Sequence, residues 1–342
     1  MKNDMKKKVV RIKDIARVLN ISTATVSRAL RDTHDVSTYT RKQVLEVASR
    51  LGYKANVHAA ALASGNTKNI VVVIPFITNY YFSSVISGIQ EVAYENGYNI
   101  VLMLTNDSSN RERYLMENLA VSNLDGLLVS ISADTSNADY FNRLIDKGIP
   151  MVFFDRVPEN LESSKVLQDD YSGAFMATDH LICKGYRRIA HLAGNEHLLI
   201  TQNRLNGYKA ALQKHRISLN HEWVLFSGFS QKSGEEDMEK IFKLKDQPNG
   251  IFAINDRRAV GAIIAIKRKG LTVGKDIGVI GFTNDPISTI IEPSLTTIEE
   301  PAFEIGKHSC ELLIKHINNS NFLPKQIVLS GSLIERESTQ RS

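Results

Sequence analysis

The sequence lacks several features that define other classes of protein. Its 342 residues include only two cysteines, Cys183 and Cys310, and no CxxC spacing. A disulfide framework and a structural zinc site are therefore not expected, and both cysteines are predicted to be plain core residues in a reducing compartment. No apolar run approaches the ~18 residues that a membrane span requires, and the charged start lacks the apolar stretch of a signal peptide. We expect a cytoplasmic protein with no membrane partner.

The motifs of common enzyme classes are also missing. The sequence has no GxSxG, no Walker A motif, no GxGxxG after a strand and no HExxH, and its nine histidines share no metal-ligand spacing. A cleft without an arranged nucleophile and base suits binding and not turnover. We therefore predict a protein that is not an enzyme and that needs neither a cofactor nor a metal ion.

The charge is unevenly distributed along the chain. The length predicts two or three domains. Residues 1–62 contain 13 Lys and Arg against 5 Asp and Glu, whereas the remainder contains 29 against 32. A basic head on a mildly acidic body is typical of a protein whose one end displaces counterions from a polyanion. The alternative on charge alone is a solvated basic tail.

The basic head has the pattern of a helix-turn-helix. Apolar residues are spaced for one helical face over residues 12–19 and again over residues 23–30. Between them Asn20 tolerates the left-handed conformation of a tight turn, and Ser22 is a good N-cap. Arg28 lies off the apolar stripe of the second helix, where an arginine can make bidentate bonds to guanine. The alternative is a surface helix with an ordinary solvated arginine. The other residues off this stripe are Thr23, Ala24, Thr25 and Ser27.

Two further helices are predicted after this pair. The first starts at Ser37 or Thr38 as cap and ends at Gly52, and its predicted buried face comprises Val44, Leu45, Ala48 and Leu51. The second starts at Asn56 and ends at Gly65, and it is too short to be stable alone in water. If DNA is its partner, Leu62 is the large apolar residue available to wedge between base steps in the minor groove. The alternative is a flexible Ala-rich linker.

The rest of the chain alternates apolar runs with amphipathic segments. Apolar runs at 70–76, 99–105, 126–131 and 151–155 are followed by a restart of the same pattern at 188–194, with later runs at 223–228, 250–255 and 276–282. Such runs indicate parallel strands covered by helices on both faces. Ligands of open α/β sheets bind beyond the carboxyl ends of the strands. The amide, carboxylate and aromatic side chains at those ends predict a site for a sugar-like ligand, although turns attract polar residues anyway. The candidates are Phe76, Asn79, Asp155, Phe229, Asn255 and Thr283.

The head contains four ordered sequence blocks, which are DIA at 14–16, TVSRAL at 25–30, TRKQVLEVASRLGY at 40–53 and LASG at 62–65. In these blocks it resembles the LacI/GalR family of bacterial transcriptional regulators. Ala55 and Ala60 depart from the family pattern in the hinge. The resemblance implies base reading by Thr23, Ala24 and Arg28, phosphate contacts by Ser22, Thr25, Ser27, Ser37 and Tyr53, and a DNA-bound hinge helix with Asn56 at its start and Leu62 as its wedge.

The resemblance continues through the body, in blocks such as RLNGYKAAL, FAINDRRAVGAI and DIGVIGF. It implies that Arg204 clamps the effector, that Asn255 bonds it and that Phe229 stacks on it. Thr283 stands where the family has an aspartate, which argues against assuming the ligand of better-known relatives.

These observations predict an all-α helix-turn-helix head with a hinge helix, followed by an α/β periplasmic-binding-protein-like sensor domain of two doubly wound parallel-sheet lobes. The predicted boundaries are 1–55 for the head, 56–68 for the hinge and 69–342 for the effector-binding and dimerisation domain. We expect a repressor that binds double-stranded operator DNA as a homodimer and responds to a small-molecule effector, a carbohydrate. The alternatives are a sugar-binding transport protein, against which the head argues, and a regulator that senses a partner protein.

Overall fold

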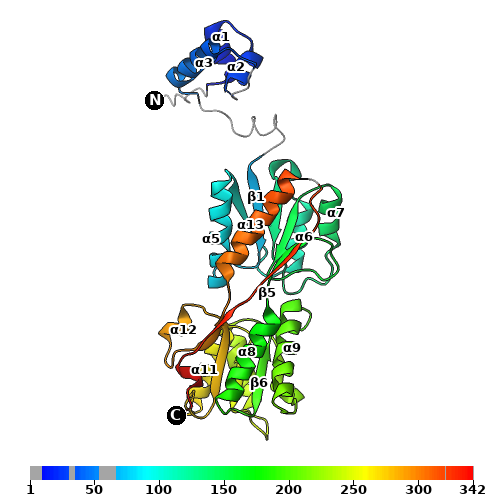
Figure 1. Cartoon of the computed structure of the whole chain (residues 1–342), viewed down its shortest axis with the longest axis vertical. Helices are drawn as coiled ribbons and strands as arrows, with labels where there is room; N and C mark the ends of the chain where they lie inside the picture. Colours follow the sequence, from blue (N-terminus) through cyan, green and yellow to red (C-terminus); the bar gives the residue numbers. More distant parts are fainter. Residues whose placement is uncertain (1–9, 31–34, 54–66, 320, 342) are drawn as a thin grey trace, which may run out of the picture. The chain divides into compact units, whose positions relative to one another are not determined.

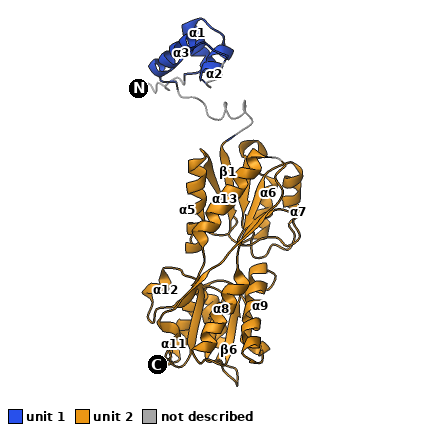
Figure 2. Ribbon diagram, viewed as in Figure 1, with its two compact units in different colours: residues 1–67 blue, residues 68–342 orange. Residues whose placement is uncertain are grey.

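The structure, a computed structural model, describes residues 10–30, 35–53, 67–319 and 321–341. The chain divides into two compact units, residues 1–67 and residues 68–342, which we call the head and the body (Figure 2). Ala55, Asn56, Ala60 and Leu62 lie outside the described residues, as does most of the predicted hinge. In the described part of the chain, no helix is both long and apolar enough to cross a membrane.

The head contains three helices, α1 (Ile12–Leu19), α2 (Thr23–Leu30) and α3 (Thr38–Leu51). Asn20 ends α1 in the predicted left-handed conformation, with φ 53° and ψ 41°. The hydroxyl of Ser37 accepts a hydrogen bond from the backbone N–H of Thr40, so Ser37 and not Thr38 is the N-cap of α3. Gly52 then ends α3 with φ 69°, a conformation that costs glycine little.

The core of the head is formed by one face of each helix. The prediction for α3 was wrong at Leu45, which is 47% exposed, whereas Val47 is buried. The two residues lie 200° apart around the helix, so only one of them can face α1 and α2. The buried residues of the head are Ile15, Ala16, Val26, Ala29, Val44, Val47 and Ala48.

The body contains two six-stranded sheets, one in each of two lobes (Figure 1). The first sheet is entirely parallel. Its strand order is β11 (Gln326–Leu329), β5 (Ser164–Gln168), β4 (Met151–Phe154), β3 (Gly126–Val129), β1 (Asn69–Ile74) and β2 (Asn99–Leu104). Its helices are α5 (Tyr80–Glu95), α6 (Ser109–Glu117), α7 (Asp139–Asp146) and α13 (Ala302–Asn318).

The second sheet is parallel except at one edge, where β12 runs antiparallel to β10. Its strand order is β12 (Ser332–Ile334), β10 (Thr296–Glu299), β9 (Gly278–Thr283), β8 (Gly250–Ala253), β6 (Ile189–Ala193) and β7 (Val224–Phe226). The helices of this lobe are α8 (Asp170–Cys183), α9 (Leu199–Lys214), α10 (Gln231–Ile241), α11 (Asp256–Arg268) and α12 (Ile287–Ile290). Short 3-10 turns lie at Val121–Asn123, His221–Trp223 and Glu337–Thr339.

The central strands of each sheet are buried on both faces, as the uninterrupted apolar runs predicted. In β1, for example, Ile70, Val72 and Ile74 pack with α5 and α13, whereas Val71 and Val73 pack on the other side with residues of α6 and α7. This alternation is the period of two that a strand imposes on its side chains. The prediction of two doubly wound lobes is confirmed.

The chain crosses between the lobes three times, after β5, after β10 and after β11 (Figure 1). The sequence pattern predicted neither β5 nor the return of α13 and β11 to the first lobe. Helix α13 packs against α5 through glycines, since a Cβ on Gly306 would lie 2.0 Å from the carbonyl oxygen of Val85. Because the chain crosses between the lobes at three places, any motion of one lobe relative to the other must be accommodated by these three connections.

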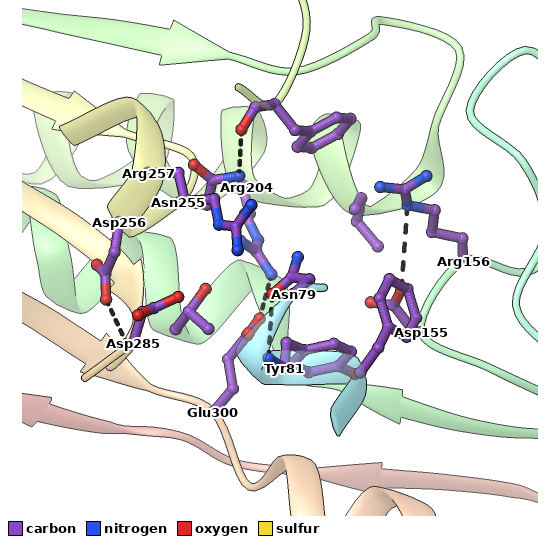
Figure 3. Close-up of a pocket in the computed structure, with 14 residues that line it drawn as sticks. Asn79, Tyr81, Asp155, Arg156, Arg204, Asn255, Asp256, Arg257, Asp285 and Glu300 are labelled. Carbon is purple, nitrogen blue, oxygen red and sulfur yellow. Dashed lines mark hydrogen bonds and ion pairs between the residues drawn. The ribbon is translucent and has the colours of Figure 1, made fainter. Parts of the chain in front are cut away.

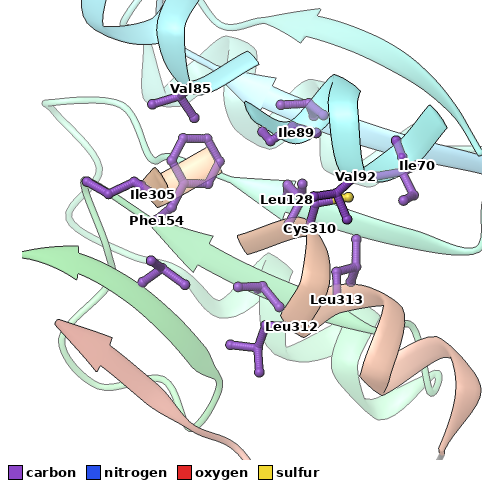
Figure 4. Packing of buried hydrophobic residues seen from close by; sticks show 14 of the residues in the cluster. Ile70, Val85, Ile89, Val92, Leu128, Phe154, Ile305, Cys310, Leu312 and Leu313 are labelled. Atoms are coloured by element: carbon purple, nitrogen blue, oxygen red, sulfur yellow. The ribbon is translucent and has the colours of Figure 1, made fainter. Parts of the chain in front are cut away.

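The two cysteines have different surroundings. Cys310 lies on α13, buried in the apolar cluster between α13, α5 and the first sheet (Figure 4). Cys183 is exposed, so its prediction as a core residue was wrong. It is the last residue of α8, where the helix end meets solvent.

Candidate functional site

The second helix of the head presents small polar residues and one arginine to solvent. Val26 and Ala29 of α2 are buried, whereas Thr23, Ala24 and Arg28 are exposed. Small side chains beside a long cationic one allow a helix to approach base edges closely while the arginine reaches them. The structure thus places the three predicted base-reading residues on one exposed surface.

Hydroxyl groups lie at the N-terminal ends of both α2 and α3. The Ser22 hydroxyl accepts a hydrogen bond from the backbone N–H of Thr25 at 3.0 Å, and Ser37 does the same for Thr40 at 3.2 Å. Helix N-termini attract anions because their first N–H groups point outward without helical partners. Ser22 and Ser37 are exposed, while Thr25, Ser27 and Tyr53 are half-buried. These five residues are the predicted phosphate contacts.

A pocket lies between the two lobes of the body, at the carboxyl ends of the strands (Figure 3). Six of the seven predicted effector residues line it. Phe76 does not line it and is 37% exposed. The lining residues are Asn79, Tyr81, Phe82, Asp155, Arg156, Ile200, Arg204, Phe229, Asn255, Asp256, Arg257, Thr283, Asp285 and Glu300.

Two of the predicted asparagines are held in place by capping a helix. The side-chain oxygen of Asn79 accepts from the backbone N–H of Tyr81 at the start of α5. That of Asn255 accepts from the N–H of Arg258 at the start of α11, and its amide nitrogen donates to the carbonyl of Phe229 at 3.0 Å. Asn255 therefore positions the loop that carries the Phe229 ring. The centre of the Phe229 ring lies 4.8 Å from the guanidinium carbon of Arg156, which covers one face of the ring.

Arg204 of α9 is buried and has a partner for every nitrogen. Its Nε donates to Asp170 at 2.8 Å, one terminal nitrogen donates to the carbonyl of Ile254 at 2.5 Å, and the other donates to Glu300 at 2.5 Å. Its guanidinium carbon lies 3.6 Å from the centre of the Phe282 ring. Two carboxylates thus share one cation. Asp170 and Glu300 were not predicted, because they lie 34 residues before and 96 residues after Arg204 and carry no pattern of their own.

The electrostatics of this cluster follow from its burial. Burial raises the pKa of Asp170 to about 6 and that of Glu300 to about 7, although Arg204 opposes both shifts. Burial also raises the pKa of Asp155, against the effect of Arg156 and Arg204. A buried carboxylate has an elevated pKa because its charged form loses hydration. Ionised carboxylates are therefore energetically unfavourable in this pocket, and it favours ligand groups that donate hydrogen bonds to them.

Tyr81 and Asp155 form a second polar group in the pocket. Asp155 follows β4 with φ 58° and accepts a hydrogen bond from the Ser130 hydroxyl at 3.1 Å. The Tyr81 hydroxyl is buried beside the Asp155 carboxylate, which it approaches without making a hydrogen bond of normal length. Burial first, and then the nearby Asp155 carboxylate, raise its pKa well above the ordinary value. An unpartnered buried hydroxyl is costly unless a ligand satisfies it. The apolar neighbours of Tyr81 gave no sequence signal for this role.

Thr283 ends β9 with φ 132°, a conformation that β-branched residues rarely adopt. The neighbouring turn is held by Asp256, whose carboxylate accepts from the backbone N–H of Asp285 at 2.8 Å and from the Thr297 hydroxyl at 2.6 Å. Burial raises the pKa of Asp256 to about 7. Backbone strain of this kind persists where surrounding contacts over-determine the conformation, often at ligand sites.

The lobes are close together around this pocket. Arg257 of α11 donates to the carbonyl of Thr78 in the first lobe at 2.8 Å, and Asn195 donates across to the carbonyl of Ala133 at 3.0 Å. The cavity has a volume of about 60 Å³, whereas small-molecule sites have roughly 300–1,000 Å³. The contacts across the cleft therefore leave little free volume between the lobes.

Comparison with known proteins matches both units of the chain. Residues 11–56 match the family described as bacterial regulatory proteins, lacI family, and residues 178–339 match the periplasmic binding protein-like domain. The HTH-type transcriptional repressor PurR of Vibrio vulnificus is 30% identical over 96% of this chain and 98% of its own length. The ribose operon repressor of Haemophilus influenzae is 31% identical with the same coverage. The structure of the transcriptional regulator CelR–cellobiose complex is 26% identical, with a TM-score of 0.73 over 96% of this chain and 99% of its own.

Proposed function

The chain belongs to the lacI family of bacterial regulatory proteins and is a DNA-binding transcriptional repressor, and we propose that its effector is a sugar or sugar derivative that binds between the lobes of the body. Regulators of this family bind operator DNA as dimers and respond to a small molecule. The relatives named for ribose and bound to cellobiose support a carbohydrate ligand.

One observation carries the proposal, namely the combination of an unsatisfied hydroxyl, buried carboxylates and a fixed aromatic ring in one cleft. The hydroxyl of Tyr81 can donate to or accept from a sugar hydroxyl, and Asp155 can accept from two of them. The ring of Phe229 offers an apolar face for the C–H face of a pyranose or furanose.

The charge of the pocket favours an uncharged sugar over a phosphorylated one. Four carboxylates line the pocket against three arginines, and Arg204 is already paired with Asp170 and Glu300. An anionic ligand would meet this excess of carboxylates in a medium of low dielectric constant, where like charges repel strongly. Sugar hydroxyls instead supply the donors that the carboxylates require.

In this proposal the effector takes the place of Glu300 at Arg204. Glu300 directly follows β10 and precedes α13, so it lies on a connection between the lobes. Release of Glu300 would free a guanidinium nitrogen to hold a ligand hydroxyl and would at the same time move this connection. Effector binding and lobe geometry are then coupled through one side chain.

For the head, we propose that Thr23, Ala24 and Arg28 read base edges. The phosphate contacts come from hydroxyl-bearing side chains of α2 and at the ends of α3. They are Ser22, Thr25, Ser27, Ser37 and Tyr53, and the hinge helix starts at Asn56 with Leu62 as the minor-groove wedge. A change of the angle between the lobes alters the spacing of the two heads of a dimer and hence operator affinity, and the coupling is reciprocal.

A thermal-shift screen tests the effector class. The full-length protein is heated with neutral pentoses, hexoses and disaccharides, and in parallel with their phosphate esters. A true effector at a hundred times its Kd stabilises the protein by about 2.7 kcal/mol and should change the affinity for an operator selected from random DNA. Stabilisation by phosphate esters alone, or by no sugar at all, would contradict the proposal.

A further inference from the structure

We propose that Asp179, Cys183 and His215 form a binding site for a zinc-class divalent cation on the surface of the second lobe. One ligand atom of each residue lies within 4.8 Å of the other two. Nε2 of His215 lies 2.8 Å from Oδ1 of Asp179, and Sγ of Cys183 lies 3.9 Å from Oδ2 of the same carboxylate. Three donor types therefore converge on one point.

The helices α8 and α9 hold these donors in place. Asp179 and Cys183 are four residues apart in α8, so they lie on the same face of the helix. His215 directly follows α9. The two helices cannot separate easily, since Gly207 of α9 is so close to α8 that a Cβ there would lie 2.2 Å from the carbonyl oxygen of Tyr171. Donors on packed helices are preorganised for a metal ion.

The ligand set selects the metal. Thiolate, imidazole and carboxylate are the three side-chain groups that bind Zn²⁺, and three protein ligands leave a fourth tetrahedral position for water. The exposure of Cys183 leaves room for that water. The soft thiolate disfavours Mg²⁺ and Ca²⁺, which take oxygen ligands. The predicted absence of a metal site rested on spacing along the sequence, and His215 lies 32 residues from Cys183.

Lys214 competes with a cation at this position. Its ammonium lies 2.8 Å from Oδ1 of Asp179, and its side chain is 53% exposed. An exposed lysine can move into solvent at little cost, since surface ion pairs contribute little. Removal of the ammonium should therefore strengthen metal binding, which is the opposite of the effect expected for the three ligands.

The test is competition for Zn²⁺ between the full-length protein and a coloured chelator, under thiol-free reducing conditions. One equivalent per chain should bind at this site, and C183S and H215A should each weaken it by at least about tenfold. K214M should bind more tightly than the wild type. H221A, which removes another exposed histidine, should leave the affinity unchanged.

Cobalt substitution gives an independent measurement. Co²⁺ bound to a thiolate absorbs in the near ultraviolet through charge transfer, and this band should be present in the wild type and absent in C183S. Burial raises the pKa of the other cysteine, Cys310, to about 12, so it stays a thiol and does not contribute. Equal zinc affinity of the wild type, C183S and H215A, or a cobalt complex without the thiolate band, would overturn the proposal. A K214M variant that binds less tightly would overturn the assignment of Asp179 as a ligand.

Discussion

The head and the body use charge in opposite ways. In the head, Arg28 and the capping serines lie at the surface, where water and salt screen their interactions. In the body, Arg204 is 4% exposed and its partners Asp170 and Glu300 are no more than 9% exposed. The head is thus suited to bind a polyanion, which releases counterions on binding. Its affinity for DNA should therefore depend on the salt concentration. The pocket of the body is suited to a ligand that displaces water, and the stability of the body should depend on pH.

The strongest test of this difference is removal of the buried cation. Arg204→Ala leaves Asp170 and Glu300 facing each other without their shared partner. Breaking a buried ion pair in this way costs about 3–5 kcal/mol, which urea denaturation of the full-length protein would measure. Arg257→Ala is the matched control, because Arg257 is exposed and loses a single hydrogen bond to Thr78. Equal stability of R204A and R257A would show that the cluster is not desolvated.

The pH dependence of the body gives the next largest effect. Burial raises the pKa of Glu300 to about 7 from an ordinary value of 4.5. The folded protein therefore holds a proton on Glu300 that the unfolded chain releases, and this contribution to stability is present below pH ~4.5 and lost as the pH rises through about 7. Between these limits, the wild type should lose up to about 3 kcal/mol relative to E300Q.

Denaturation midpoints measured from pH 5 to pH 8 would show this difference as a steeper fall for the wild type. The exposed carboxylate of Glu236 provides a control, since E236Q should follow the wild-type curve. Parallel curves for the wild type and E300Q would mean that Glu300 is already ionised across this range.

In the head, Arg28→Ala should weaken binding to the selected operator by about 1–3 kcal/mol, or roughly 5- to 150-fold. The loss should be largest for the preferred sequence and small for random DNA, because a base contact carries the specificity. Effector binding should not change. Arg17→Ala is the control, as Arg17 is exposed on α1 and lies outside the recognition helix. Fluorescence anisotropy would measure both, and an R28A protein with wild-type operator affinity would contradict the assignment of α2.

The two regions also differ in how far their sites could be predicted from sequence. The signals in the head are local, since Asn20, Ser22 and Ser37 cap or connect helices formed by their immediate neighbours. Most of the predicted pocket residues were found from the strand ends, because parallel strands bring their carboxyl ends to the same edge of a sheet. Glu300 and Asp170 could not be predicted, since each lies next to a connection between the lobes and far along the chain from Arg204.

The failures at single residues have a similar physical cause. Leu45 and Val47 are both apolar, and helical periodicity alone does not decide which of two neighbouring apolar residues faces the partner helices. Phe76 lies two residues after the end of β1, where a pocket residue is expected, yet its side chain is partly exposed at the surface. Position along a strand predicts an edge of the sheet, whereas the direction of a loop side chain depends on tertiary packing.

The smallest predicted effect separates two roles of one residue. Ser37 caps α3 through its bond to Thr40, and it is also a proposed phosphate contact. Ser37→Ala should destabilise the head by about 0.5–2 kcal/mol and weaken operator binding. Ser37→Asp keeps an equally good cap but places a negative charge where a phosphate would lie, so it should preserve stability and weaken operator binding further. Hydrogen exchange of the α3 amides would report the cap, and anisotropy would report the DNA contact. If S37D binds operator as tightly as the wild type, Ser37 acts only as a cap, and the hydroxyl groups at the start of α3 do not face the phosphates.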